Sequence, residues 1–145
     1  MNIEELYNNV FKRPLNEIRL HGFIAQNLIV NKHGLAYIFI SDELMKSFNV
    51  DSSSAGNLIN SFSNIEDLYV RVFFSEDSKN KIIKVNIRSN GPIVNTIAEK
   101  YNGGGHKFAA GIRLTNLDDV KNILNDLDDA CKLYKKELRS KNENK

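Results

Sequence analysis

Hydrophobic positions near the start of the chain recur with helical spacing. They fall three or four residues apart, as one apolar face of a helix requires: Ile3, Leu6, Tyr7, Val10 and Phe11. Pro14 interrupts this pattern, and residues 15–20 are expected to form a second short helix or turn. We therefore expect residues 1–18 to form an N-terminal helical segment, either a linker from a preceding domain or a simple cap.

The next two apolar runs are rich in β-branched and aromatic residues. Residues 21–30 and 35–40 are predicted to be strands. The sequence Asn-Lys-His-Gly at residues 31–34 predicts a hairpin-type turn between them.

Two helix starts follow these strands. Ser41 and Asp51 are residue types whose side chains often accept a backbone hydrogen bond at the start of a helix. We expect one helix to run from Ser41 to about Phe48, and a second to cover residues 55–62.

In the middle of the chain, successive side chains fall on two alternating faces, as in a β-strand. In residues 67–74 one face carries Leu68, Val70, Val72 and Phe74, and the other carries Tyr69, Arg71 and Phe73. Residues 75–80 are expected to be a polar turn. In the partner strand, residues 81–88, three apolar positions alternate with Lys84, Asn86 and Arg88, so this polar face meets solvent or a ligand.

Helical spacing returns after Asn90-Gly91-Pro92. Residues 94–101 are predicted to form a short amphipathic helix, and residues 109–114 a last strand. The longest helical stripe follows, with Thr115 and Asp118 as a capping-box-like start. Its apolar members are Leu117, Val120, Ile123, Leu124, Leu127, Ala130, Cys131, Tyr134 and Leu138.

These patterns predict an α+β fold. We expect a mixed β-sheet of about five strands with helices packed on it, and a long C-terminal amphipathic helix across one face. The expected main domain covers residues 19–140, and residues 141–145 are expected to be a frayed tail.

Composition excludes several classes of protein. The net charge of +2 is too small for a general nucleic-acid coat, so any anion site must be local. The single cysteine, Cys131, excludes a disulfide within the chain and a cysteine-based zinc site, and we expect it to be buried. No apolar run approaches the roughly 20 residues that span a bilayer, and the start lacks a signal-peptide pattern. We therefore expect no membrane association and a cytoplasmic location.

The sequence Gly-Gly-Gly-His-Lys at residues 103–107 carries the strongest chemical signal. Three glycines remove every Cβ from one turn, so that backbone N–H groups can approach an anion closely. If a helical turn began at His106, its positive end would face that anion too. The alternative is a tight connection between helix and strand without further function.

Other polar residues suit the same anion. The planar guanidinium of Arg88 matches a phosphate, Ser89 adds a hydroxyl, and His106 can donate to a phosphate or a nucleoside. Lys107 could reach a phosphate or point to water, and Asn95 could approach the loop or be structural. Each residue also has an ordinary alternative: solvation for the arginine, turn chemistry for the serine, and a structural hydrogen bond for the histidine. Three aromatic residues could stack on a base but are more often core or interface: Tyr69, Phe73 and Phe108.

Three segments together carry a resemblance to a known family. They are the strand that ends in Arg88-Ser89, residues 94–101, and the glycine stretch of residues 103–111. They resemble the C-terminal DHH-associated domain of DHH-family phosphoesterases in the RecJ superfamily, most like the bacterial nanoRNases that also hydrolyse pAp. The specific match covers residues 81–114. Related domains occur in cyclic-dinucleotide phosphodiesterases and alanyl-tRNA synthetases.

The resemblance implies a substrate-binding role. It assigns Arg88, Ser89, Gly103, Gly104, Gly105 and His106 to a clamp on a nucleotide phosphate, with short RNA, a dinucleotide or pAp as partner. The family's catalytic half carries an Asp-His-His run, and this chain has none. We therefore expect no catalytic or metal-ligating residue and no cofactor in this chain. The resemblance places a divalent metal, Mn or Mg, in a missing catalytic domain, and a homodimer of the parent protein is a further expectation.

Three interpretations of function remain open from the sequence. The chain is either the binding half of a metal-dependent phosphoesterase, inactive alone, or a stand-alone module for RNA or tRNA, or a structural domain with a glycine connector.

Overall fold

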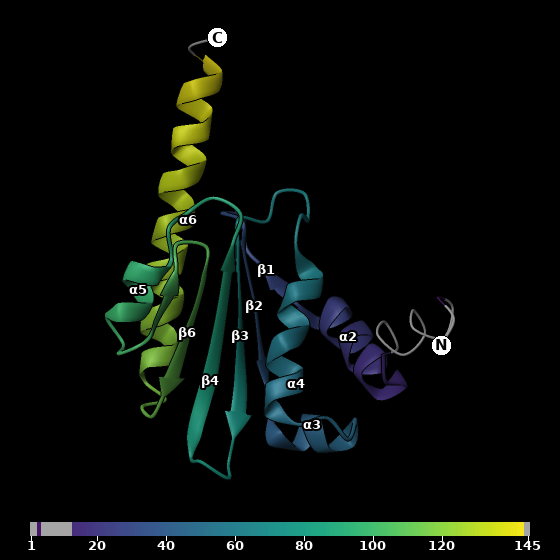
Figure 1. Cartoon of the computed structure of the whole chain (residues 1–145). Helices are drawn as coiled ribbons and strands as arrows, with labels where there is room; N and C mark the ends of the chain where they lie inside the picture. Colours follow the sequence, from purple (N-terminus) through teal and green to yellow (C-terminus); the bar gives the residue numbers. More distant parts are fainter. Residues whose placement is uncertain (1–2, 4–12, 144–145) are drawn as a thin grey trace.

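A computed structural model describes Ile3 and residues 13–143, and the predicted α+β fold is confirmed (Figure 1). Its mixed sheet has six strands rather than about five, because residues 104–106 add a short edge strand, and their order is β1-β2-β3-β4-β6-β5. Strands β2 and β3 are parallel, and the other neighbours are antiparallel. The strands are β1 (Ile29–Val30), β2 (Leu35–Ile40), β3 (Val70–Asp77), β4 (Ile82–Ser89), β5 (Gly104–His106) and β6 (Ala109–Leu114).

Helices cover the two faces of the sheet unequally. Figure 1 shows two helices on one side, α5 (Asn95–Glu99) and the long α6 (Asp119–Glu143). The other side carries α2 (Leu15–Asn27), α3 (Asp42–Ser47), α4 (Ser52–Asn57) and the 3₁₀ helix η1 (Leu58–Phe62).

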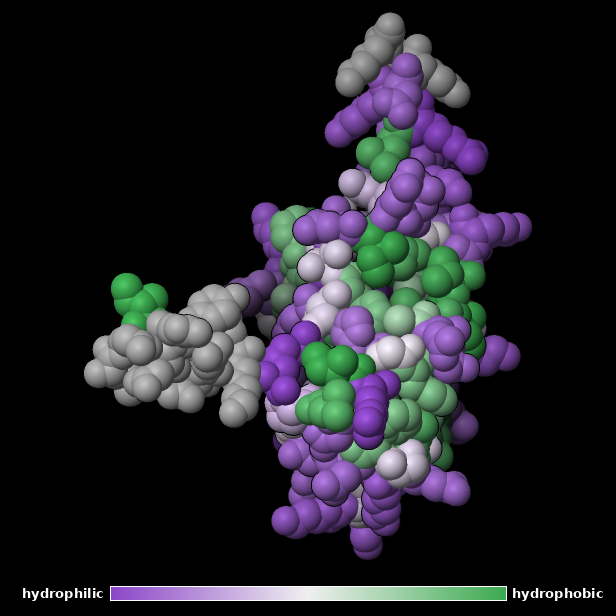
Figure 2. Space-filling model, turned by 90° about the vertical axis from the view of Figure 1, so that its right-hand side faces the viewer, coloured by the Kyte–Doolittle hydropathy of each residue, from purple (hydrophilic) through white to green (hydrophobic). Residues whose placement is uncertain are grey.

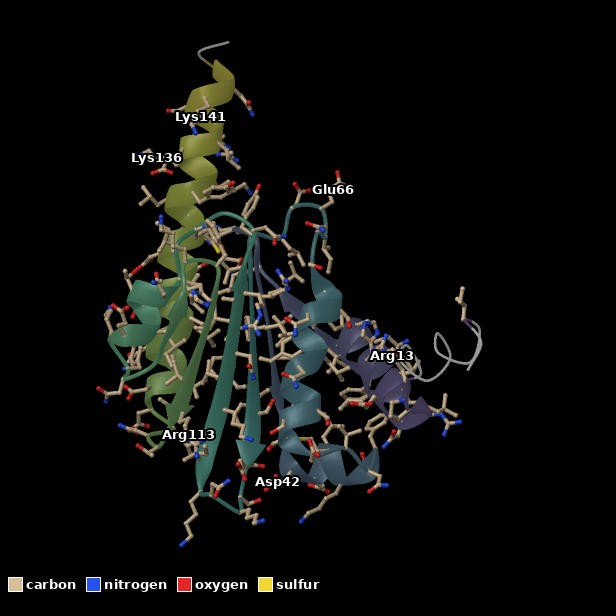
Figure 3. All side chains as sticks on the ribbon, viewed as in Figure 1. Arg13, Asp42, Glu66, Arg113, Lys136 and Lys141 are labelled. Atoms are coloured by element: carbon tan, nitrogen blue, oxygen red, sulfur yellow. The ribbon has the colours of Figure 1, made fainter. Side chains whose placement is uncertain are left out.

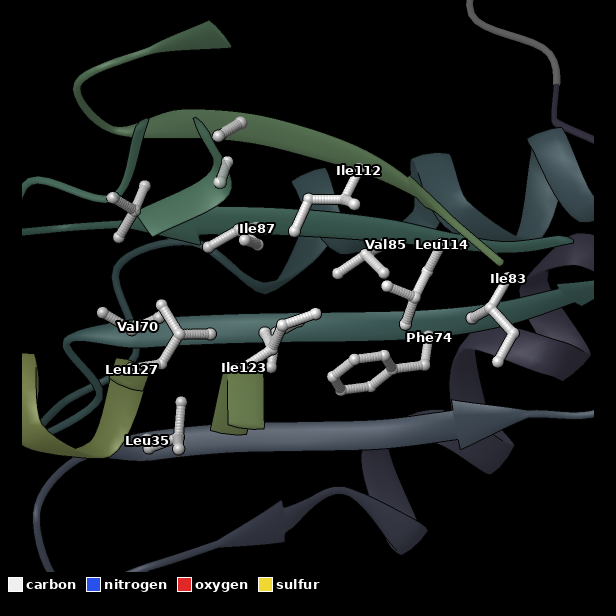
Figure 4. Packing of buried hydrophobic residues seen from close by; sticks show 14 of the residues in the cluster. Leu35, Val70, Phe74, Ile83, Val85, Ile87, Ile112, Leu114, Ile123 and Leu127 are labelled. Carbon is white, nitrogen blue, oxygen red and sulfur yellow. The ribbon is translucent and has the colours of Figure 1, made fainter. Parts of the chain in front are cut away.

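The larger core lies between the sheet and α6. Ile123, Leu127 and Cys131 are fully buried on one stripe of α6 and belong to this core. Figure 4 shows Ile123 and Leu127 packed over the apolar face of the sheet. That face carries the alternate residues Ile83, Val85 and Ile87 of β4, as the sequence predicts. Burial raises the pKa of the Cys131 thiol to about 12.

A second core lies on the opposite face, between α2, α3, α4 and strands β2 and β3. Its members include Leu20, Ile24, Ile38, Ile59 and Phe73. Phe73 is completely buried there, so it does not stack on a base from solvent. This second core stops at β3, and no comparable apolar layer of described residues covers the same face of β4, β6 and β5.

The expected strand over residues 21–30 is wrong. Helix α2 continues to Asn27, and only Ile29 and Val30 form a strand. Leu20 and Ile24, one helical turn apart, are fully buried against the second core, and this tertiary contact outweighs the strand propensity of the segment. The turn at residues 31–34 is confirmed.

The two predicted caps are confirmed. Ser41 Oγ accepts a hydrogen bond from Leu44 N at 3.1 Å, and Asp51 Oδ1 accepts one from Ser54 N at 2.7 Å. The Ser54 hydrogen bonds lower the pKa of Asp51. Helix α4 starts directly after Asp51, earlier than expected, and tightens into η1 at residue 58.

The end of β3 and the start of α6 also differ from the sequence expectation. Strand β3 extends to Asp77 through the expected polar turn, because Asp77 pairs with Ile82 of β4. Asn116 Oδ1, rather than Thr115, accepts a hydrogen bond at the start of α6, from Asp118 N. Leu117 precedes the helix and is 66% exposed, so it does not join the apolar stripe.

The terminal boundaries of the predicted domain remain predictions. Helix α2 crosses the expected boundary at residues 18 and 19, and α6 continues through Glu143, past the expected end at residue 140. The predicted N-terminal helix lies outside the described residues except for Ile3. Within the described part of the chain, no helix has the length and apolar character that a bilayer crossing needs.

Leu127→Ala should destabilise the protein by about 2–5 kcal/mol, because it opens a cavity under α6. Leu133→Ala is the matched control on the same helix: Leu133 is 59% exposed, and its truncation should change the free energy of unfolding by less than about 0.5 kcal/mol. Chemical denaturation measures both. Equal effects would contradict the packing of α6 described here.

Candidate functional site

The sheet face beside α4 holds an open groove of about 540 Å³. One wall is α4, and the floor and far side come from β4, β6 and the start of β5. Polar and glycine residues line most of it: Ser52, Ser53, Asn57, Lys84, Asn86, Asn102, Gly103, Gly104, Gly111 and Arg113, with Val85 and Ile112. The groove lies where the second core ends.

The strand register places two predicted site residues in one row across this face. Arg88 of β4 is opposite Ala109 of β6, and Ala109 is opposite His106 of β5. Directly opposed residues share a face of the sheet, so Arg88 and His106 flank the small Ala109 on the groove side. On its other side Arg88 is opposite Arg71 of β3.

The Arg88 guanidinium is half-buried and held in place. Its Nε donates to Asn60 Oδ1 at 3.0 Å, and Nη1 donates to the Ile87 carbonyl at 2.9 Å. Burial lowers the pKa of Arg88, although a guanidinium stays charged in proteins. The remaining N–H donors of this fixed group are the ones that a ligand can use.

Arg71 extends this row, and the sequence did not single it out as a candidate site residue. It is only 6% exposed; its Nε donates to the Ile59 carbonyl at 3.3 Å, and Nη1 to Asn90 Oδ1 at 3.4 Å. Burial, and then the charge of Arg88, lower the pKa of Arg71. Among the described residues no carboxylate forms an ion pair with either arginine, so two positive charges lie side by side without a counterion.

The three consecutive glycines at residues 103–105 have different structural roles. Asn102, at φ 64°, lets the chain leave α5, and a Cβ at Gly103 would clash with the Gly111 carbonyl. Gly105 has φ 146°, and its Cβ would clash with the backbone of Ala109. Gly104 is different, because a Cβ there would meet no atom within 4 Å and its φ is not in the left-handed region. Gly103 and Gly105 are therefore needed for close strand packing, whereas Gly104 leaves the groove open.

No helix begins at His106, contrary to the conditional expectation. His106 ends β5, and residues 107 and 108 form the turn into β6. The reason is non-local: β5 pairs with β6 through Gly104–Gly111 and His106–Ala109. A helix dipole therefore does not contribute at this position.

Ser89 lies on the opposite face from Arg88 and is buried. Its Oγ donates to the Pro92 carbonyl at 2.5 Å and accepts from Gly91 N at 3.1 Å, while Ser89 N donates to the Phe108 carbonyl. The hydroxyl proton is thus used within the turn. Ser89 holds the end of β4 and the β5–β6 turn together instead of joining the row of Arg88.

Four other predicted residues lie around the site rather than in the row. Lys107 and Phe108 are exposed in the β5–β6 turn. Asn95 is half-buried at the start of α5, on the far face of the sheet, and its Oδ1 has no hydrogen-bond partner. Tyr69 packs edge-to-face on Tyr134 of α6, with ring centroids 5.1 Å apart.

Lys84, Asn86 and Arg113 line the groove, although the sequence singled out none of them as site residues. Lys84 is opposite Arg113, and Asn86 is opposite Gly111, in the two rows after that of Arg88. Figure 3 shows Arg113 toward the lower end of the sheet. Lys84 Nζ donates to Ser53 Oγ at 2.9 Å and so ties β4 to α4. The polar alternation of β4 was the available signal for these positions.

The family resemblance places a divalent metal in a missing catalytic domain, and the residues of this groove do not suit such an ion. Within the described residues, no three His, Cys, Asp or Glu side chains come together to hold a metal ion. The groove side chains are amides, hydroxyls and cations, which suit an anion. We therefore derive no chemical step through a metal in this chain.

Comparison with known proteins identifies the family of this chain. The family model of the DHHA1 domain matches residues 31–133. The chain is 38% identical over 128 residues to the bifunctional oligoribonuclease and PAP phosphatase NrnA of Bacillus subtilis, covering 88% of this chain and 40% of the relative. A probable NrnA of Streptococcus mutans is 27% identical over 82% of this chain and 38% of the relative. The chain thus spans about two fifths of the length of these relatives.

Solved structures show the same fold. An exopolyphosphatase-related protein from Bacteroides fragilis superposes with a TM-score of 0.75 at 24% identity, over 96% of this chain and 41% of that one. PggH, a pGpG-specific phosphodiesterase from Vibrio cholerae, gives a TM-score of 0.58 at 12% identity, over 83% of this chain and 40% of that one. Together with the match over residues 31–133, these findings show that the chain belongs to the DHHA1 family, as the DHH-associated domain of NrnA-like phosphoesterases.

Proposed function

We propose that this chain is the substrate-binding domain of a phosphoesterase that acts on short RNA, a dinucleotide or pAp. In this proposal the groove face of β4, β6 and β5 holds the substrate by its phosphate and leaves hydrolysis to a separate DHH-type catalytic domain. Arg88 and His106 contact the phosphate, and Gly103 and Gly104 allow the substrate close to the backbone. Ser89 holds the turn that follows β4, and Gly105 allows β5 to pack closely against β6. Lys107 and Asn95 have at most a supporting role.

The row Arg71–Arg88–Ala109–His106 carries this proposal. Two arginines that form no ion pair with a carboxylate among the described residues lie in one row with a histidine, and Ala109 alone lies between Arg88 and His106 in that row. Bringing two like charges together in a partly buried place is unfavourable unless an anion compensates them. A phosphate is the anion whose geometry best matches the guanidinium fork.

The names of the relatives narrow the class of ligand. The Bacillus subtilis relative is an oligoribonuclease and PAP phosphatase, and the Vibrio cholerae structure is a phosphodiesterase for pGpG. All three substrates are nucleotides with a phosphate next to a ribose. The amides of Asn57 and Asn86 in the groove offer both donors and acceptors for the nucleoside part.

The proposal extends to the whole protein. The catalytic domain would hold a divalent metal, manganese or magnesium, which supplies an activated water when bound. The complete protein would act in the cytoplasm and form a homodimer. The binding half alone would position the substrate and carry out no hydrolysis.

Arg88→Ala should weaken binding of pAp by about tenfold or more, since one charge-assisted contact contributes roughly 1.5–3 kcal/mol. Arg88→Lys should recover only part of this loss, because lysine keeps the charge but lacks the planar fork. Arg19→Ala, at an exposed position on α2, is the matched control and should bind like the parent chain. Isothermal titration of the three variants measures the effect. Unchanged affinity in Arg88→Ala would refute the proposed site.

Substitutions at neighbouring glycines should separate binding from stability. Gly104→Val should abolish pAp binding while the melting temperature stays near that of the parent, because valine suits an extended strand and its side chain enters open space. Gly105→Ala should instead lower the free energy of unfolding by about 1–3 kcal/mol, because φ 146° and the Ala109 backbone both oppose a Cβ. Thermal denaturation and pAp titration of both variants test this. The reverse pattern would mean that Gly104 has the structural role.

A further inference from the structure

A second polar cavity, separate from the groove, lies between the β1–β2 turn and the C-terminal half of α6. It has a volume of about 670 Å³, and every residue that lines it is basic: Lys32, His33, Lys132, Lys135, Lys136 and Arg139. We call it the basic pocket. It contains five of the twenty lysines and arginines of a chain whose net charge is only +2, so the positive charge is concentrated there.

Specific contacts build the basic pocket. Asp128 of α6 accepts hydrogen bonds from Asn31 Nδ2 at 2.7 Å and from His33 Nδ1 at 2.9 Å, and these bonds fix the turn against the helix. Lys135 Nζ donates to the Lys32 carbonyl at 2.8 Å. The pocket therefore joins two segments about a hundred residues apart in the sequence, and its walls are held in place.

The four basic residues on α6 have positions i, i+3, i+4 and i+7, which place them on one face of the helix. Like charges at this spacing repel and destabilise a helix. Lys132 Nζ lies 3.4 Å from Asp128 Oδ2 and so forms an ion pair, but neither Lys136 nor Arg139 forms an ion pair among the described residues. An anion in the pocket would relieve this repulsion.

The pocket lies at the same end of the sheet as Arg88. Leu35, just after the β1–β2 turn, pairs with Val70, and Val70 pairs with Ser89 at the end of β4. Leu35 and Ser89 are therefore two strand spacings apart, which is about 10 Å. Gly91, which follows β4 at this end of the sheet, lies against the ring of Tyr134 on α6.

The part of α6 that bears the pocket is freely accessible. Figure 3 shows Lys136 on the upper half of α6, above the level of the sheet, and Figure 2 shows that this projecting part is covered mainly by hydrophilic side chains. Lys136 and Arg139 are both exposed. Several cations spread along one surface suit a chain of phosphates better than a single phosphate group.

We propose that the basic pocket is a second RNA-contact site, which binds the backbone phosphates of the nucleotides that extend beyond the one held at Arg88. This inference rests on the proposed function, since it takes RNA as the ligand of the first site. It predicts that the pocket contributes to the binding of longer RNA and not to that of pAp.

The test compares two ligands on matched double variants of the 145-residue chain. Lys136→Gln/Arg139→Gln removes two charges from the pocket, and Lys79→Gln/Lys121→Gln removes the same charge from exposed positions elsewhere. The probes are pAp and a single-stranded RNA of about eight nucleotides, titrated at several salt concentrations. The pocket variant should bind pAp like the parent but the RNA about tenfold more weakly, with the salt slope reduced by about 1.4 for two lost phosphate contacts. The control variant should bind both ligands like the parent.

Other outcomes would overturn the inference in distinguishable ways. Equal RNA affinity and salt slope in both variants, with pAp still bound, would refute the basic pocket alone. Equal loss of RNA binding in both variants would indicate a general charge effect and refute it too. Failure of the parent chain to bind either ligand would overturn the proposed function together with this inference. Unchanged RNA binding with reduced binding to phosphatidylserine–phosphatidylcholine vesicles would assign the pocket to a lipid surface instead.

Discussion

The pairing of β4 with its neighbours is the constraint on which the rest of the structure depends. Ile83, Val85 and Ile87 must lie on the face that α6 covers, because burying them against Ile123 and Leu127 forms the larger core. The alternate residues are then forced onto the opposite face. A slip of one residue would bury Arg88 under α6 and expose Ile87, so the hydrophobic effect that stabilises the fold also orients the site.

The same strand pairing explains why β6 carries the small residues Ala109 and Gly111 on this face. Gly111 lies between Asn86 and Gly104 and lines the groove, and Ala109 lies between Arg88 and His106 in the next row of the same face. Larger side chains at these positions would fill the space between the strands and α4. The second core covers β2 and β3 but not β4, β6 and β5, and this unequal cover leaves a polar sheet face open beside the helix.

Sequence reasoning succeeded where a single period runs without interruption. Strand β6 and the long stripe of α6 were predicted because their apolar positions repeat regularly, and Arg88 was selected with the polar face of β4. It failed where a contact distant in the sequence decides the structure. Helix α2 is held by the second core, and β5 exists only because β6 pairs with it. Arg71 looked like an ordinary polar strand residue, and only its burial at 6% exposure, in contact with the Ile59 carbonyl of η1, distinguishes it.

Amide NMR shifts of the labelled chain during a pAp titration test most directly whether pAp binds on the groove face. We expect the largest shifts at Arg88, Gly104, His106 and Gly111, which lie on three neighbouring strands of one face. Residues of α6 such as Leu127 and Tyr134, on the other side of the sheet, should change little. Shifts concentrated on α6, or none on β4, β5 and β6 at saturating pAp, would contradict the account.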